Sequence, residues 1–127
     1  MKPLFQQAIE FRVAMGQPLN TKDETVHELQ HRLIKEEWHE FDEAFDHEFS
    51  SLGSLDENKV NQLKELSDLV FVCYQFAAAR GWDLDTALNR VFESNMSKLV
   101  DGKPLRRDDG KVLKGPNYQP PVLDDLI

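Results

Sequence analysis

Residues 21–49 read TKDETVHELQHRLIKEEWHEFDEAFDHEF, and this stretch decides the fold class. Its apolar residues recur every three or four positions, which is the period of an amphipathic helix. Thr21 and Glu24 have the spacing of a capping box, the usual signal for a helix start. We therefore predict one long helix that ends at about Phe49. The apolar positions that carry the period are Val26, Leu29, Leu33, Trp38, Phe41, Phe45 and Phe49.

A shorter helix is predicted before this stretch, and a turn after it. Residues 2–15 place apolar side chains at four-residue spacing, and Gly16 followed by Pro18 ends that pattern. The segment SSLGS, residues 50–54, has the composition of a turn. The long helix is therefore bounded on each side by a segment that interrupts helical structure.

A second long helix follows the turn. Ser54 and Glu57 form another capping-box pattern, and apolar residues continue at helical spacing through residues 56–80. Gly81 is the predicted C-terminal cap, because glycine readily adopts the left-handed conformation that ends many helices. The pattern is long enough for about seven helical turns.

The C-terminal third of the chain differs in character. Asp83 or Asp85 is predicted to cap a fourth helix that ends near Val100. Glycine and proline interrupt residues 101–127 too often for another long helix. Residues 103–114 hold five basic residues against two aspartates, although the chain as a whole is acidic. This segment is either a solvated tail or an arm that grips phosphate groups.

Together these elements predict an all-α protein. A length of 127 residues suits one domain with a modest core, which self-association would enlarge. We predict a four-helix bundle over residues 1–100, with residues 101–127 as an irregular basic arm of the same domain. No internal repeat is visible in the sequence.

Composition limits the partners and the location. The net charge of −8 argues against binding to nucleic acid or to acidic membranes, which requires a basic surface. The single cysteine, Cys73, excludes an intrachain disulfide, and its apolar surroundings predict a buried, inert thiol. The N-terminus lacks the features of a signal peptide, and the longest apolar run is too short to span a bilayer. We expect a cytoplasmic protein, in the host cytoplasm if it is phage-encoded.

Acidic residues interrupt the apolar faces of both long helices. In the segment EEWHE, the side chains of Glu36, Glu37 and Glu40 lie three or four positions apart and can share one face. That face continues the apolar stripe of the helix. Glu65 and Asp68 repeat the spacing among leucines of the next helix. Charged groups are rarely buried unless they are paired, and no lysine or arginine occupies a matching position in these stripes.

A metal ion is the simplest partner for such carboxylates. Carboxylate oxygens suit Mg²⁺ or Mn²⁺, whereas zinc prefers cysteine or histidine. Mg²⁺ takes one or two carboxylates and completes its shell with water and phosphate oxygens, so four carboxylates predict at least two ions and a phosphate-bearing substrate. Two-ion sites serve in-line displacement at phosphorus. The alternative is that these acids are merely exposed on amphipathic helices.

Two other functions stay open from the residues alone. The spacing Glu-x-x-His, at Glu28 with His31 and at Glu36 with His39, matches di-iron carboxylate bundles. That architecture needs the two pairs on different helices, and here one predicted helix carries both. A non-enzymatic helical partner protein would use the acidic face and the basic arm for contacts. Such a protein would not need acids in its core stripes, and its stability would not respond to Mg²⁺.

The acids of the two long helices read EExxE and then ExxD, which resembles the signature of the MazG-like all-α nucleoside triphosphate pyrophosphohydrolases. That superfamily also contains phosphoribosyl-ATP pyrophosphohydrolases and the all-α dUTPases. The segments NMSK (95–98) and DGKPLRRDDGKVLKGPNYQPPVL (101–123) are similar to small MazG-like proteins of bacteria and phages. The resemblance covers about residues 24–123. It implies a catalytic bundle that converts nucleoside triphosphates to monophosphates and pyrophosphate.

The resemblance also implies a role for each motif residue. The implied metal ligands are Glu37, Glu40, Glu65 and Asp68. Glu36 would bind a further ion or act as the base that activates water. The implied phosphate and sugar contacts are Asn95, Lys98, Lys111, Lys114 and Tyr118. Because family members form dimers or tetramers in which two chains build each site, we expect a homo-oligomer, with a tetramer slightly favoured over a dimer.

The substrate base is the least determined part of this expectation. The resemblance places the base near the first helix and the loop after it, where Phe11 could stack on a base and Gln17 and Asn20 could read its edge. Gln17 and Asn20 equally suit the turn around Pro18. Trp38 belongs either to the core or to the base pocket. Similarity to small phage-type relatives favours a purine, guanine in dGTP or GTP in particular.

Overall fold

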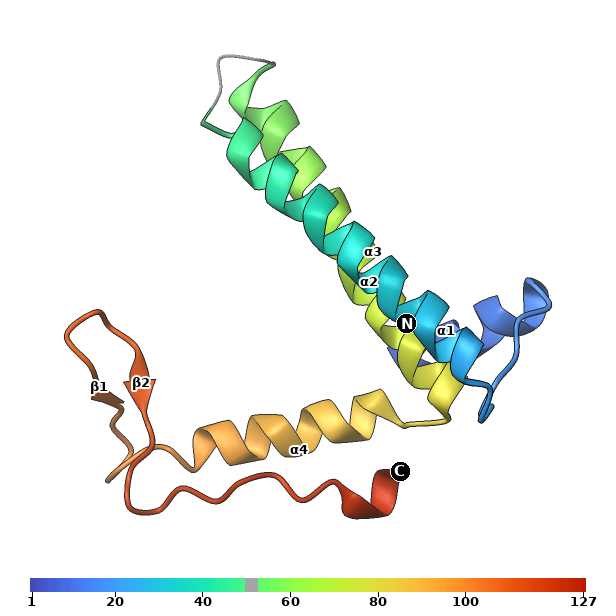
Figure 1. The fold of residues 1–127 in the computed structure, drawn as a ribbon. Coiled ribbons are helices and arrows are strands. Elements are labelled where there is room, and N and C mark those ends of the chain that lie inside the picture. The colour runs from blue at the N-terminus through green and yellow to red at the C-terminus, as the bar shows by residue number, and fades with distance from the viewer. Residues whose placement is uncertain (50–52) are drawn as a thin grey trace. The chain divides into compact units, whose positions relative to one another are not determined.

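The protein is all-α apart from one small hairpin, as expected from the sequence (Figure 1). The computed structural model describes residues 1–49 and 53–127. Its elements are α1 (Leu4–Ala14), α2 (Glu24–His47), α3 (Leu55–Arg80), α4 (Leu84–Met96), β1 (Leu105–Arg106), β2 (Val112–Leu113) and a final 3₁₀ turn (Asp124–Leu126). Most of the predicted turn SSLGS, residues 50–52, lies outside the described residues. Among those described, no helix is both long and apolar enough to cross a membrane.

The start of α2 differs from the prediction. Asp23, not Thr21, is the N-terminal cap, and its carboxylate accepts a hydrogen bond of 3.0 Å from the backbone N–H of Thr25. The predicted capping box of Thr21 and Glu24 is therefore wrong. The reason is tertiary, because the backbone N–H of Thr21 donates to the carbonyl of Ala79 at the end of α3. That contact holds Thr21 outside the helix.

The ends of α3 agree with the prediction. Ser54 and Glu57 form the expected capping box, in which each side chain accepts from the other residue's backbone N–H. Gly81 is the C-terminal cap, with φ of 77°. A side chain at Gly81 would also collide with Asn20, whose Oδ1 lies 2.5 Å from the position of a Cβ. This glycine therefore satisfies both the helix end and the approach of the loop before α2.

The first compact unit, Met1–Trp82, is a long antiparallel hairpin of α2 and α3 with α1 packed against α3 (Figure 1). Its buried apolar core consists mainly of alanines, which allow the helices to approach closely. Phe11 on α1 meets Phe71 on α3 edge to face, with ring centroids 5.0 Å apart. Buried Arg12 ties the following loop to α1, since its Nε donates to the carbonyl of Pro18 at 2.8 Å.

The apolar stripe predicted for α2 is only partly buried in this chain. Leu29, Trp38, Phe45 and Phe49 are exposed. On α3, four apolar residues at spacings of three, three and four are between 42% and 68% exposed. We call this set the α3 stripe: Val60, Leu63, Leu66 and Val70. The hairpin therefore presents apolar faces that the other elements of the first unit, Met1–Trp82, leave uncovered.

The second compact unit, Asp83–Ile127, contains α4 and the C-terminal segment. Asp83 caps α4, as one of the two predicted alternatives. The helix ends at Met96 instead of near Val100, because Val100 pairs with Lys103 in a bridge that turns the chain. The rest is irregular, as predicted, except for the two-residue strands β1 and β2. This grouping does not test the predicted division at residue 100, which stays a prediction.

Candidate metal centre

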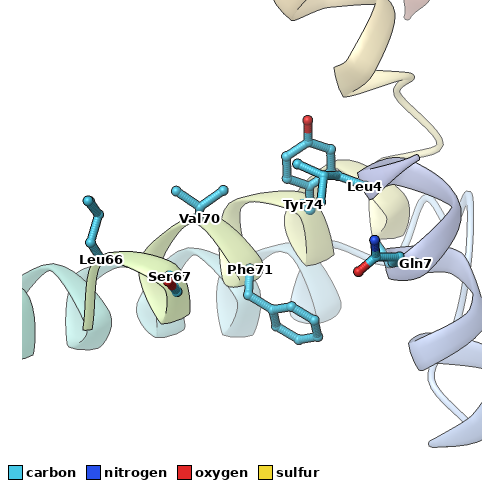
Figure 2. Close-up of a pocket in the computed structure, with 8 residues that line it drawn as sticks. Leu4, Gln7, Leu66, Ser67, Val70, Phe71 and Tyr74 are labelled. Atoms are coloured by element: carbon cyan, nitrogen blue, oxygen red, sulfur yellow. The ribbon is translucent and has the colours of Figure 1, made fainter. Parts of the chain in front are cut away.

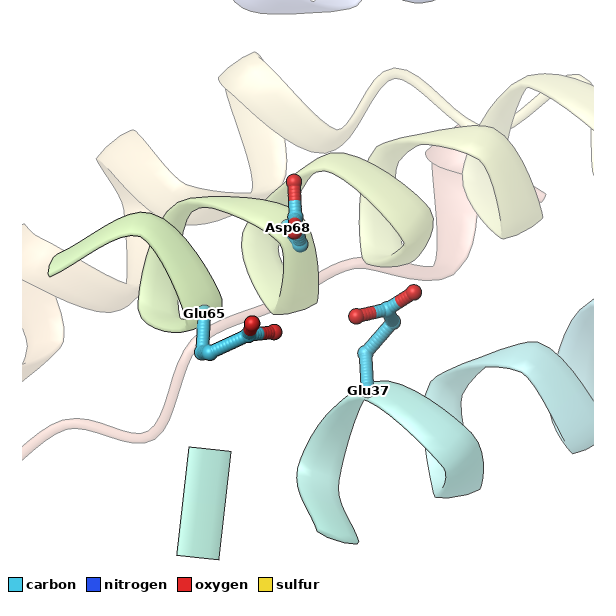
Figure 3. A group of neighbouring side chains, drawn as sticks. All are labelled: Glu37, Glu65 and Asp68. Carbon is cyan, nitrogen blue, oxygen red and sulfur yellow. The ribbon is translucent and has the colours of Figure 1, made fainter. Parts of the chain in front are cut away.

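Three carboxylates meet at the middle of the α2–α3 hairpin. Glu37 comes from α2, and Glu65 and Asp68 come from successive turns of α3. One oxygen of each lies within 4.8 Å of the other two. Figure 3 shows Glu37 and Glu65 projecting into the space between the two helices. The i, i+3 spacing on α3 lets both acids reach Glu37 of α2, whereas the sequence required only that at least one of them point toward packed surface.

The electrostatics of the cluster centre on Glu37. Burial is the largest influence and raises the pKa of Glu37 to about 7. A hydrogen bond with Glu40 and the negative charges of Glu40, Asp68 and Glu65 act in the same direction. Each of these disfavours the ionised carboxylate. A cation placed among the three acids would reverse that balance.

The structure also contains a cation that the sequence analysis missed. The ammonium of Lys64 lies 3.0 Å from Asp68 and 3.3 Å from Glu65. Lys64 does not lie in the apolar stripe of α3 that Glu65 and Asp68 interrupt. Its long side chain nevertheless reaches one turn along the helix to Asp68. The four-residue spacing between Lys64 and Asp68, which is typical of ion pairs along a helix, is the feature of the sequence that predicts this contact. One exposed lysine leaves the cluster with excess negative charge.

Two buried carboxylate oxygens indicate where a metal ion would fit. Oε2 of Glu37 and Oε2 of Glu65 have no hydrogen-bond donor in the described structure. Buried acceptors in proteins are almost always satisfied, so these atoms require a partner. Oxygen ligands lie about 2 Å from Mg²⁺, so three oxygens within 4.8 Å of one another leave room for such an ion between them. The donor set of carboxylates alone suits a hard divalent cation.

The other two acids of the signature lie differently. Glu40 is exposed and contacts Glu37, but it is not among the carboxylates that meet within 4.8 Å in the described part of the chain. Glu36 is exposed on α2. Both face solvent on the helix that carries Glu37. A ligand or water bound at the cluster could reach them from outside the hairpin.

The residues expected to contact phosphates all belong to the second unit. Asn95 lies in the last turn of α4, and Lys98 directly follows that helix. Lys111 and Lys114 flank β2 and are exposed. The ammonium of Lys114 lies 4.7 Å from the centre of the Tyr118 ring. The structure therefore groups Lys114 with Tyr118.

The four residues proposed for a base pocket do not come together within the described chain. Phe11 packs on Phe71, and Asn20 covers Gly81. Gln17 is exposed in the loop after α1. Trp38 is about half exposed, and α2 carries it about 20 Å from the helix start at Glu24. Asn20 thus has a structural role at a helix end.

A cavity that the sequence analysis did not predict lies between α1 and α3. It has a volume of about 350 Å³ and is mostly apolar (Figure 2). Its walls include Leu4 and Ala8 from α1 and Leu66, Val70 and Tyr74 from α3. Leu66 and Val70 belong to the α3 stripe, so the cavity continues that exposed surface. The sequence signal was the four-residue apolar spacing of both helices.

Comparison with known families gives one family match. The model of the family described as phosphoribosyl-ATP pyrophosphohydrolase matches residues 4–95. The match includes α1, α2, α3 and nearly all of α4, and therefore every carboxylate of the cluster. No curated protein matches the chain. Because the match extends over more than half of the sequence, the chain belongs to the phosphoribosyl-ATP pyrophosphohydrolase family, within the MazG-like all-α pyrophosphohydrolases, and its activity is that of a nucleotide pyrophosphohydrolase in general.

Proposed function

We propose that this protein is a magnesium-dependent enzyme that converts nucleoside or deoxynucleoside triphosphates to monophosphates and pyrophosphate. The cluster of Glu37, Glu65 and Asp68 is the observation that carries the proposal. It combines three carboxylates with two buried oxygens that have no donor. Mn²⁺, which also binds carboxylates, would replace Mg²⁺.

Each acidic residue has a proposed task. Glu37, Glu65 and Asp68 would hold the ions, and Glu40 would complete the ligand set from the exposed side of α2. Bound ions would lower the pKa of the attacking water and neutralise phosphate charge. Glu36 is exposed next to this set and would take the proton from that water as it attacks the α-phosphorus. Placing the water in line with the leaving pyrophosphate is the main contribution of the site.

The second unit would supply positive charge to the leaving group. Asn95 and Lys98 would contact the sugar and phosphates, while Lys111, Lys114 and Tyr118 would close over the phosphates. Lysine acts there as a compact point charge. These residues would serve the cluster of their own chain or that of a neighbouring copy.

The ExxH spacing does not favour a di-iron centre. Both pairs lie on α2, and the side chains of Glu28, His31, Glu36 and His39 are all exposed. A di-iron bundle requires these groups to project inward from different helices. The carboxylate-only cluster supports magnesium instead.

One substrate screen tests the proposed function. Purified protein with Mg²⁺ would be given the eight common ribo- and deoxyribonucleoside triphosphates and, because of the family match, phosphoribosyl-ATP. We expect pyrophosphate release from triphosphates, with dGTP or GTP slightly favoured. If phosphoribosyl-ATP were hydrolysed and none of the eight triphosphates were, the proposed substrate class would be wrong. Absence of pyrophosphate release from every compound would refute the enzymatic proposal.

A further inference from the structure

The C-terminal segment, residues 119–127, is fastened along α4. The guanidinium of Arg90 donates to both carboxylate oxygens of Asp125, at 2.5 and 3.0 Å. The same guanidinium donates to the carbonyl of Val122 at 3.0 Å. A planar guanidinium that makes two parallel bonds to a carboxylate fixes orientation as well as distance. Arg90 therefore holds this segment at two points.

A second set of contacts fastens the beginning of the same segment. The hydroxyl of Ser94, which is buried, donates to the carbonyl of Gln119 at 2.7 Å. The backbone N–H of Gln119 donates to the hydroxyl oxygen of Ser97 at 2.9 Å. Ser97 lies seven residues from Arg90, which is two helical turns. Pro120 and Pro121 stiffen the chain between the two attachments.

These contacts close a loop. Since Gln119 is bonded to Ser97, residues 98–118 leave α4 and return to the same end of it. The loop is braced inside by the pairing of Val100 with Lys103 and by the β1–β2 hairpin. Gly115 lies so close to Lys98 that a Cβ there would be 2.9 Å from the Lys98 carbonyl oxygen. The loop carries Lys98 and the five basic residues of the segment 103–114.

We propose that the contacts of residues 119–127 with α4, which we call the C-terminal clasp, set the affinity of the basic loop for the triphosphate. Arg90 and Asp125 are then positioning residues, which act through Lys98, Lys114 and Tyr118. The inference rests on the proposed function, because it takes the loop to be the phosphate-binding part. It adds that a pair of residues outside the signature determines how that loop is held.

Kinetics with three variants test the clasp. Asp125→Asn removes one charge at constant volume, and Arg90→Asp places like charges together. The double variant Arg90→Asp/Asp125→Arg restores opposite charges. We expect KM for the triphosphate to rise about threefold for Asp125→Asn and further for Arg90→Asp, with kcat nearly unchanged. The double variant should recover much of the loss. Glu10→Gln, which breaks the exposed ion pair of Lys2 in the first unit, is the control and should leave KM unaltered.

Limited trypsin digestion tests the same proposal without using activity. Trypsin cleaves after Arg106, Arg107 and Lys111, which are exposed in the loop. We expect faster cleavage in Asp125→Asn and Arg90→Asp, and weaker protection by pyrophosphate with Mg²⁺, than in wild-type protein. Unchanged cleavage, or faster cleavage with unchanged KM and unchanged protection, would overturn the clasp. If neither the wild-type protein nor any variant hydrolyses a triphosphate, the proposed function fails. The difference between wild type and variants in protection by pyrophosphate still tests the clasp.

Discussion

Glu37 belongs both to the packed interface of α2 and α3 and to the carboxylate cluster. It continues the apolar stripe of α2 and is consequently carried into the helix interface, where burial and neighbouring acids raise its pKa to about 7. A carboxylic acid with this pKa is partly protonated at neutral pH, and a bound cation would displace the proton. The same arrangement that destabilises the free protein would therefore favour metal binding.

This gives a prediction for stability against pH in the absence of metal. The pKa of Glu37 is higher in the folded protein than in the unfolded chain, so the folded state holds more protons between about pH 4.5 and about pH 7. Its contribution is therefore most favourable at the acidic end and is lost as the pH rises through that window. Urea unfolding in chelator should show this decrease in wild-type protein and a smaller one in Glu37→Gln. Equal pH slopes in the two proteins would contradict the assignment.

The metal ligands give a second prediction. Glu37→Gln and Asp68→Asn keep the side-chain volume but remove the charge that holds the ion. Each should lower turnover by more than the roughly 10–100-fold caused by changing groups that only hydrogen-bond to ligands. Far-ultraviolet circular dichroism should remain that of a helical protein. Glu43→Gln, an exposed glutamate of α2, is the matched control. Near wild-type turnover in both ligand variants would defeat the assignment.

The sequence predicted the site residues that lie on the apolar stripes and missed those that do not. Glu37, Glu65 and Asp68, which the structure brings together, were predicted because each interrupts an apolar stripe and because the acids of the two helices resemble the family signature. Lys64 was missed because a flexible side chain reaches beyond its own stripe. The base pocket depended on the loop between α1 and α2, whose path follows from contacts with α3 that no local pattern reveals.

At the scale of elements, local signals predicted helix ends correctly where the capping hydrogen bonds stay within the helix. The capping box of Ser54 and the cap at Gly81 are of this kind. The start of α2 was misplaced because the backbone of Thr21 is bonded to Ala79, far away in the sequence. The end of α4 was misplaced for a different, local reason, since Val100 pairs with Lys103 three residues later in a turn.

The contact between the end of α3 and the loop before α2 gives a third prediction. Gly81→Ala should destabilise the fold by more than about 1 kcal/mol, because φ is 77° and the new Cβ would meet the Asn20 side chain. Asn20→Gly removes that side chain at a position where φ is also positive. The double variant should therefore recover the steric part of the loss. A double-mutant cycle from thermal unfolding measures this coupling, and strictly additive effects would show that the two residues do not meet.

At the scale of the whole molecule, the first unit exposes many large apolar side chains, and contiguous apolar surface of this kind often marks an interaction site. The α3 stripe and the adjoining cavity of about 350 Å³ form one such surface. Sequence periodicity predicted which residues are apolar. It could not predict which faces the first unit itself covers, since that depends on how α1 packs against α3.

We therefore propose that a second copy covers this surface in a homo-oligomer, a tetramer slightly favoured over a dimer. Light scattering at micromolar concentration should give a multiple of the 14.7 kDa chain mass. Leu63→Lys, in the α3 stripe, should lower that mass while the helical content stays constant. Val13→Lys, at an equally exposed apolar residue of α1, is the control. A monomer mass for the wild-type protein would contradict the proposal.

The central claim is that the carboxylate cluster would hold metal ions beside a nucleoside triphosphate whose α-phosphorus is attacked by water. Hydrolysis in ¹⁸O-labelled water, followed by mass spectrometry of the products, tests it most directly. We predict monophosphate and pyrophosphate as the first products, with the label in the monophosphate, and no reaction in excess chelator. Label in the pyrophosphate, release of diphosphate with orthophosphate, or full activity in chelator would contradict the account.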